Sequence, residues 1–165
     1  MLSNGERLLR EYVALLFPGE DVVYNYRPSW LLGLELDIFL PRINLAFEFN
    51  GDQHYVDTEF GPCKKQIARD RMKRDLCYKN RVSLVIIEAI DLEYTKLRSK
   101  IKVKIRHNKK IALQRMSSGT KKKLSAINKR AIEYRKGLIQ KYNSPTARQK
   151  GGQPRKDALA ERIIS

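Results

Sequence analysis

The stretch Leu34–His54 reads LELDIFLPRINLAFEFNGDQH, and it decides the fold of the chain. Two runs rich in strand-forming residues, Leu34–Leu40 and Leu45–Asn50, are separated by the turn-like segment Pro41–Asn44, a pattern typical of a β-hairpin. Side chains alternate between the two faces of a strand. One face of the hairpin is therefore predicted to carry Leu34, Leu36, Ile38, Leu40, Leu45, Phe47 and Phe49, and the other Glu35, Asp37, Glu48 and Asn50.

The polar face of this hairpin has the composition of a metal site. Carboxylates on adjacent strands repel one another and raise one another's proton affinity unless a cation lies among them. Hard oxygen ligands of this kind suit Mg²⁺, with Mn²⁺ as a substitute. The alternative is an ordinary solvent-exposed face, but such faces commonly mix positive and negative charges. The polar loop that follows ends in His54, which favours a functional site.

The segments on either side of the hairpin indicate an α/β domain. Ser3 and Glu6 have the spacing of a helix capping box, and Pro18 ends the predicted helix. Residues 21–26 are predicted as a strand, residues 63–80 as a helix and residues 82–87 as a buried strand. The apolar stripe of the second helix is predicted to contain Ile67, Ala68, Met72, Leu76 and Cys77. The resulting order is α-β-β-β-α-β.

Beyond residue 91 the chain is strongly basic and mostly helix-forming. Residues 92–107 are predicted as one helix, and Thr120 is a candidate cap for a longer one with an apolar stripe that includes Ile127 and Ala131. We therefore divide the chain into a core, residues 1–90, and a basic helical extension, residues 91–165, with a flexible arm near residues 143–156. The stripe is expected to pack on the core or against a second copy.

The charge of the chain is unevenly distributed. The net charge is +16, yet residues 1–61 contain ten Asp and Glu against four Lys and Arg. A protein that only coats a polyanion has no use for an acidic first third, because carboxylates repel phosphate. The division makes sense if carboxylates hold a metal ion that contacts phosphate while the basic part supplies affinity. The candidate nucleic-acid-binding residues are Lys121, Lys122, Lys123, Lys129, Arg130, Arg135, Lys136, Arg148, Lys150, Arg155 and Lys156.

The hairpin, its polar loop and the segment with Asp70 that follows resemble the PD-(D/E)xK nuclease superfamily. The closest similarity is to the branch of very-short-patch-repair endonucleases and phage homing endonucleases with an E-D-H-D site. The resemblance covers about residues 5–90 and implies a restriction-endonuclease-like core. It also implies a Mg²⁺-dependent enzyme that hydrolyses the phosphodiester bonds of DNA, in a bacterial or phage-infected cell.

The resemblance also implies roles for individual residues. Asp37 and Glu48 would be metal ligands together with the backbone carbonyl of Phe49. His54 would act on the attacking water or as a proton donor. The additional acidic positions would be filled by Glu35 and by Asp70 on the following helix.

One position departs from the family pattern. The lysine expected two residues after the glutamate is Asn50 here, and either His54 or Lys73 could replace it. The interpretation is a homing-type or repair-type endonuclease. The alternatives are a structure-specific nuclease or junction resolvase, which would gain if the chain is a homodimer, and a non-catalytic nucleic-acid-binding protein on a decayed nuclease fold. Two cysteines and the lack of a signal-like or membrane-spanning segment lead us to expect a cytoplasmic protein.

Overall fold

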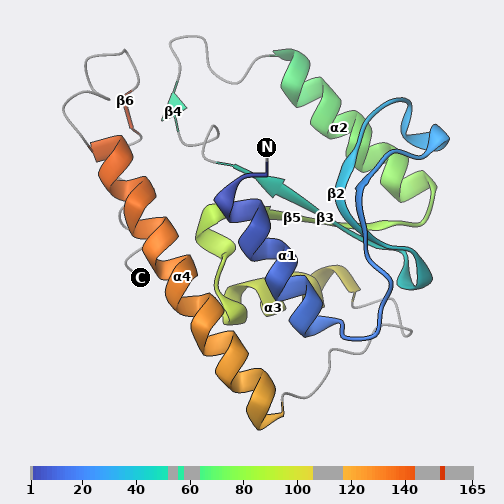
Figure 1. Ribbon diagram of the computed structural model, residues 1–165. Coiled ribbons are helices and arrows are strands. Elements are labelled where there is room, and N and C mark those ends of the chain that lie inside the picture. Colours follow the sequence, from blue (N-terminus) through green and yellow to red (C-terminus); the bar gives the residue numbers. More distant parts are fainter. Residues whose placement is uncertain (1, 52–55, 58–63, 106–116, 144–152, 155–165) are drawn as a thin grey trace.

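The computed structural model describes residues 2–51, 56–57, 64–105, 117–143 and 153–154, and the following account concerns these residues. Figure 1 shows a central sheet with helices on both of its sides. The helices are α1 (Asn4–Leu16), α2 (Lys64–Lys79), α3 (Tyr94–Ile105) and α4 (Ser118–Asn143). The strands are β1 (Val23–Tyr26), β2 (Leu36–Leu40), β3 (Leu45–Asn50), β4 (Val56–Asp57), β5 (Ser83–Glu88) and β6 (Gln153–Pro154).

The main sheet has the order β1-β2-β3-β5. The first three strands are antiparallel neighbours, and β5 runs parallel to β3 because the chain crosses over through α2 between them. The predicted hairpin is present, with Ile38 opposite Phe47 and Leu40 opposite Leu45. Its connection is a short 3-10 turn at Pro41–Ile43, and Asn44 after it has a φ of +49°. The mixed α/β class and the α-β-β-β-α-β order are confirmed, with the short β4 added before α2.

Both faces of the sheet are buried, and this corrects one part of the strand prediction. Ile38, Leu40 and Phe47 belong to the larger core, together with residues of α1. Leu34 and Leu36, expected on that same face, instead pack with Phe39 and Ala46 in a second core under α2. The strict alternation of β2 is therefore broken between Leu36 and Ile38, at Asp37.

Helices α3 and α4 complete the larger core. Leu97 and Ile101 of α3 and Ile127 and Ala131 of α4 pack in the same cluster as α1 and the sheet. The side chain of Tyr12 donates a 2.5 Å hydrogen bond to Asn128, which ties α1 to α4. The expectation that the apolar stripe of the last helix packs on the core is thus confirmed. A division of the chain near residue 90 remains a prediction, and this part of the core crosses it.

Two sequence-based expectations about the helices were wrong. Helix α4 begins at Ser118, with Ser117 accepting a hydrogen bond from the backbone N–H of Thr120, so Thr120 is not its cap. In α2, Ile67 and Met72 are exposed, and the buried part of the predicted stripe is Cys77 with partly buried Leu76. Within the described ranges, no helix is long and apolar enough to cross a membrane.

Gly5 of α1 lies close to side chains of both β3 and α4. A Cβ atom at Gly5 would lie 2.2 Å from Cζ of Phe49 and 2.8 Å from the hydroxyl oxygen of Tyr134. Both distances are shorter than real Cβ contacts, so any larger residue must displace the ring of Phe49. The absence of a side chain at position 5 thus fixes the place of Phe49 beside the hairpin.

We expect Gly5→Ala to destabilise the protein by about 1–3 kcal/mol, because the added methyl group overpacks this contact. The free energy of unfolding in urea measures the effect. Gly137→Ala is the matched control: it lies within α4, has open space around its Cα, and should stabilise by about 0.5–1 kcal/mol. Equal effects of the two substitutions would contradict the packing role of Gly5.

Candidate functional site: a buried carboxylate pair where the hairpin opens

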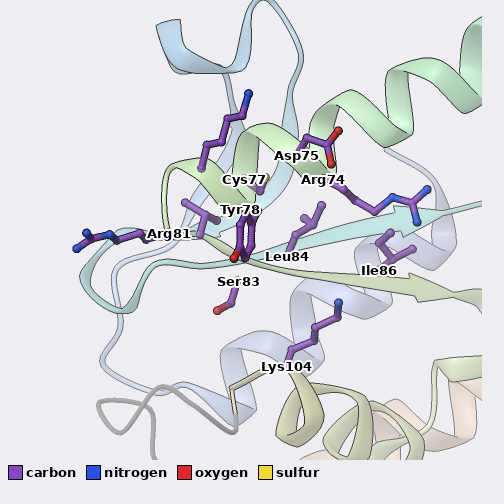
Figure 2. Close-up of a pocket in the computed structure, with 11 residues that line it drawn as sticks. Arg74, Asp75, Cys77, Tyr78, Arg81, Ser83, Leu84, Ile86 and Lys104 are labelled. Atoms are coloured by element: carbon purple, nitrogen blue, oxygen red, sulfur yellow. The ribbon is translucent and has the colours of Figure 1, made fainter.

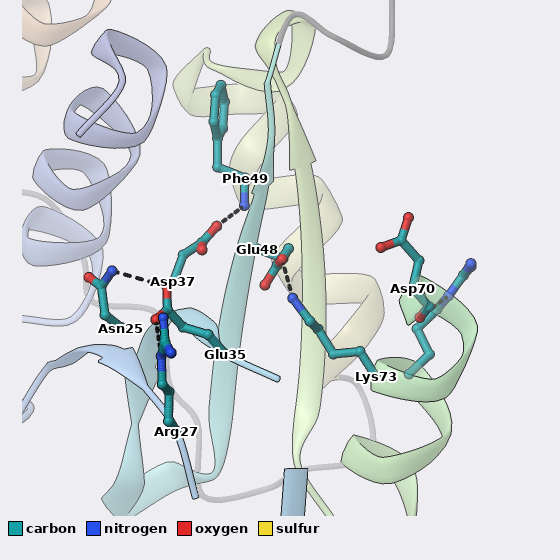
Figure 3. Close-up of polar contacts among 9 residues, drawn as sticks. Asn25, Arg27, Glu35, Asp37, Glu48, Phe49, Asp70 and Lys73 are labelled. Atoms are coloured by element: carbon teal, nitrogen blue, oxygen red, sulfur yellow. Dashed lines mark hydrogen bonds and ion pairs between the residues drawn. The ribbon is translucent and has the colours of Figure 1, made fainter. Parts of the chain in front are cut away.

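Asp37 lies where the pairing of β2 with β3 stops. The paired residues run from Leu40–Leu45 to Ile38–Phe47. Beyond that pair, a side-chain oxygen of Asp37 accepts a 2.7 Å hydrogen bond from the backbone N–H of Phe49 (Figure 3). The carboxylate therefore takes the place that a backbone carbonyl would hold in a continued ladder.

The same geometry determines the direction of the Phe49 carbonyl. In a strand, the N–H and C=O of one residue point to the same neighbouring strand. Since the N–H of Phe49 points to Asp37, its carbonyl faces the same opening between β2 and β3. Asp37 and Phe49 thus meet at one end of the hairpin, and Glu48 is the residue before Phe49.

Glu48 is directed toward helix α2 and is largely buried. One of its oxygens forms an ion pair with the ammonium group of Lys73, and the other is buried with no hydrogen-bond partner in the part of the chain that the structure describes. Burial raises the pKa of Glu48 to about 7; the negative charge of Asp37 adds to the rise, and Lys73 opposes it. The fold holds this carboxylate in a state that favours a proton or another cation at its unpartnered oxygen.

Asp37 shares this electrostatic environment. Burial raises its pKa above the ordinary value, and the hydrogen bond from Phe49 opposes the rise. Glu6 on α1 also raises the pKa of Asp37 through its charge. This neighbour could not be expected from the sequence, because Glu6 has the spacing of a capping residue and only the packing of α1 on the sheet brings it near Asp37.

Glu35 is held by groups from the edge of the sheet. It accepts hydrogen bonds from Asn25 at 3.0 Å and from Arg27 at 2.6 Å (Figure 3). Its charge still acts on Asp37 and raises the pKa of that residue. The predicted acidic patch is therefore narrower than expected: Asp37 and Glu48 form its centre, and Glu35 lies beside it with cationic and amide partners.

Helix α2 supplies the other wall of the site. Asp70 and Lys73 line a pocket of about 210 Å³ together with Glu48 and Asn50. Asp70 acts on Glu48 through its charge and raises the pKa of that carboxyl. The sequence-based grouping of Asp70 and Lys73 with the hairpin acids agrees with this arrangement. His54 lies outside the described residues.

The oxygen atoms of Asp37, Glu48 and the Phe49 carbonyl are of the chemical type that binds a hard divalent cation. Within the described ranges, no group of three or more His, Cys, Asp or Glu side chains is arranged to hold a metal ion. The charges of Asp37 and Glu48 nevertheless act on each other at the hairpin opening, and one buried oxygen of Glu48 has no hydrogen-bond partner among the described residues. Oxygen donors of this kind are those that Mg²⁺ accepts, with water completing its coordination.

The basic residues of α4 divide into two groups. Lys121, Lys122, Lys123, Lys129 and Lys136 are exposed. Arg130 instead forms an ion pair with Glu11 of α1, and Arg135 is 8% exposed and directed to Glu93. These two arginines hold α4 on the core, which leaves the lysines as the predicted contacts to nucleic acid. Arg148, Lys150, Arg155 and Lys156 lie outside the described residues.

Comparison with known proteins gives two relatives of unknown function. The chain is 35% identical to the uncharacterized protein 033L of Invertebrate iridescent virus 3 over 92 residues, which covers 50% of this chain and 47% of that protein. It is 33% identical to the uncharacterized protein 307L of Invertebrate iridescent virus 6 over 110 residues, with coverage of 50% and 54%. The chain thus spans about half the length of these relatives. No family model and no solved structure matches it.

We expect the stability of the metal-free protein to depend on pH through Glu48. Its pKa is raised in the fold to about 7, so its stabilising contribution is complete below its unfolded pKa of about 4.3 and is lost as pH rises through 7. Glu48→Gln stays neutral at every pH. In EDTA, the gain in free energy of unfolding from this substitution should be larger at pH 8 than at pH 5 by roughly 1–3 kcal/mol, because pH 5 lies only slightly above the unfolded pKa.

Urea unfolding at the two pH values measures this difference. Glu20→Gln is the control, because Arg42 lowers the pKa of Glu20 and the substitution should give no gain at pH 8. A difference between native protein and Glu48→Gln that is the same at pH 5 and pH 8 would exclude a raised pKa at Glu48.

Proposed function

We propose that this protein is a Mg²⁺-dependent endonuclease that hydrolyses phosphodiester bonds in DNA, built on a restriction-endonuclease-like core. The observation that carries the proposal is the partly buried pair Asp37 and Glu48 at the hairpin opening, with one buried oxygen of Glu48 that has no hydrogen-bond partner among the described residues. Burying two neighbouring carboxylates is unfavourable unless a cation compensates them. Such a pair does not stabilise the fold by itself and is expected where the protein binds a cation that takes part in its function.

Asp37, Glu48 and the carbonyl of Phe49 would hold the metal ion. When bound, Mg²⁺ makes an attacking water more acidic and stabilises the charge that develops on the phosphate oxygens. The chain itself positions the ligands: Phe49 fixes Asp37 through its N–H, and α2 fixes Glu48 through Lys73. Exposed lysines of α4 would attract the polyanionic substrate to the same protein.

Lys73 is our candidate to replace the lysine that the family pattern expects at position 50, where this chain has Asn50. Its ammonium group reaches the Glu48 carboxylate from α2, whereas the family pattern expects a lysine on the strand itself. Asn50 lines the same pocket. We propose that Lys73 does the work of the missing strand lysine, orienting the attacking water and stabilising the negative charge that develops on the phosphate.

The remaining parts of the proposal rest on the resemblance and the relatives. The substrate that the enzyme cuts would distinguish a homing, a repair and a junction-resolving type. A homodimer would favour the junction-resolving type, because its two sites could cut symmetrically. Because the relatives come from iridescent viruses, an infected host cell replaces the bacterial setting as the proposed location. The chain spans about half of each relative, so the proposed activity is assigned to this chain and not to the whole of those proteins.

We expect the protein to nick or cut supercoiled plasmid or branched DNA in Mg²⁺ or Mn²⁺ and to be inactive in EDTA. Asp37→Asn and Glu48→Gln should each lower the cleavage rate by a factor of about 100 or more, because each removes one of the two charged ligands. Gel electrophoresis of the products measures the rate. Metal-dependent cleavage that survives both substitutions would place the reaction elsewhere, and binding of DNA without any cleavage would favour a non-catalytic protein.

We expect Lys73→Met to reduce cleavage by about 100-fold while leaving DNA affinity within a few-fold of the native value, since Lys73 is engaged with Glu48 and not with the solvent-facing surface. Lys102→Met is the control, because this lysine is exposed on α3 and lines neither the pocket of Glu48 nor the neighbouring hollow. Cleavage rates and DNA affinities measured side by side separate the two roles. A loss of affinity as large as the loss of rate would show that Lys73 only binds substrate.

A further inference from the structure

A second and larger hollow lies beside the candidate site, at the open edge of the sheet. Strand β5 is the last strand of the sheet, and the end of α2 and the end of α3 flank it. The hollow has a volume of about 790 Å³ and is lined by Tyr78, Arg81, Ser83 and Lys104 among others (Figure 2). We call it the β5-edge groove. Its size lies within the range of about 300–1,000 Å³ that is usual for small-ligand sites.

Tyr78 is the unusual side chain of the groove. It is 86% exposed, although it stands on a helix whose neighbouring Cys77 is buried. Tyrosine carries a large, flat ring, and an exposed ring of this kind offers a face on which another planar group can stack. Figure 2 shows Tyr78 among the residues that line the groove, with Arg81 and Arg74 on opposite sides of it in this view.

Arg81 occupies a position that usually belongs to glycine. Helix α2 ends with a hydrogen bond from Val82 N–H to the Cys77 carbonyl and another from Arg81 N–H to the Tyr78 carbonyl. This is the Schellman arrangement, whose left-handed residue is Arg81 with a φ of +56°. A left-handed arginine costs about 1–2 kcal/mol relative to the ordinary backbone, so its presence points to a use of the side chain.

The charge of the groove matches an anionic ligand. Four cationic residues line it, namely Arg74, Lys79, Arg81 and Lys104, against the single carboxylate of Asp75. Lys79 lies in the last turn of α2, where the negative end of the helix dipole stabilises its charge. Arg74 bonds the carbonyl of Asp70, and Arg81 and Lys104 are exposed. Cations from α2, from the turn after it and from α3 thus line the same groove as the exposed ring of Tyr78.

The groove is continuous with the candidate active site. Arg74, Leu84 and Ile86 line both the β5-edge groove and the pocket that holds Glu48 and Lys73. Asp70, Arg74 and Tyr78 are spaced four residues apart on α2 and so lie along one side of that helix. A chain-like ligand in the groove would therefore reach Glu48 and Lys73 at its other end.

We propose that the β5-edge groove binds an unpaired segment of nucleic acid, with a base stacked on Tyr78 and phosphates contacted by Arg81, Arg74 and Lys104. This inference rests on the proposed nuclease function and names its substrate class: DNA with a single-stranded segment beside the cleavage point. A base can cover the ring of Tyr78 only when it is not stacked within a duplex. An aromatic platform flanked by cations is the usual means of holding a single strand.

Binding in EDTA tests the proposal without any dependence on cleavage. The probe is a fluorescein-labelled single-stranded oligodeoxynucleotide of about 16 nucleotides, compared by anisotropy with its duplex form. Tyr78→Ala should weaken single-strand binding about tenfold or more, whereas Tyr78→Phe should retain it because the ring is kept. Neither variant should change duplex affinity by more than about twofold. Tyr24→Ala, which removes an exposed tyrosine of β1, is the matched control and should have no effect.

Two further variants separate binding from folding. Arg81→Gly removes the charge and places glycine at the left-handed position, so it should raise the melting temperature. It should also weaken single-strand binding. The slope of log affinity against log salt concentration should become smaller by about one, the value for one lost phosphate contact. Lys104→Ala should weaken binding, and Lys102→Ala should not, although both lysines are exposed on α3 and only Lys104 lines the groove.

Each result decides one question. Equal affinities of native protein, Tyr78→Ala and Arg81→Gly for the single strand overturn the groove assignment, even if the protein cuts DNA. Loss of duplex binding to the same extent as single-strand binding overturns the substrate class. Single-strand binding that depends on Tyr78 in a protein that cuts no DNA upholds the groove and rejects the nuclease.

Discussion

The hydrogen bond from the backbone of Phe49 to the carboxylate of Asp37 is the contact on which the arrangement of the site depends. It ends the pairing of β2 with β3, and the ladder opens at the point where Glu48 faces α2. A carboxylate in that position is buried by the strands around it, so its negative charge must be compensated nearby. Lys73 compensates part of the charge on Glu48, and one oxygen of Glu48 has no partner among the described residues.

The hairpin and its acidic pair could be predicted from the sequence because both follow from local periodicity. Apolar residues alternate with polar ones through Leu45–Asn50, and that strand has the predicted faces, with Phe47 in one core and Ala46 in the other. The buried strand β5 was equally readable as a continuous run of β-branched residues. These features depend on neighbours in the chain and need no knowledge of distant contacts.

What the sequence could not supply depends on contacts between distant segments. The change of face between Leu36 and Ile38 arises where a side chain replaces a ladder bond, and no pattern of hydrophobic residues signals such a replacement. The approach of Glu6 to Asp37 and the pairing of Arg130 with Glu11 likewise follow from how α1 packs on the sheet and on α4. Arginines that looked available for nucleic acid were therefore partly committed to holding the fold.

The apolar stripe predicted for α2 was wrong because this helix presents polar side chains to the candidate site. A helix that only covers a sheet is expected to be amphipathic, yet α2 leaves Ile67 and Met72 exposed and buries little beyond Cys77. Its polar side chains contact the site: Lys73 meets Glu48, and Asp70 lines the same pocket. The physical demand on α2 is thus to present charged groups along the edge of the sheet, and a weak apolar stripe is the expected consequence. Under this interpretation the helix that joins β3 to β5 determines how a substrate is held as well as how the sheet is closed.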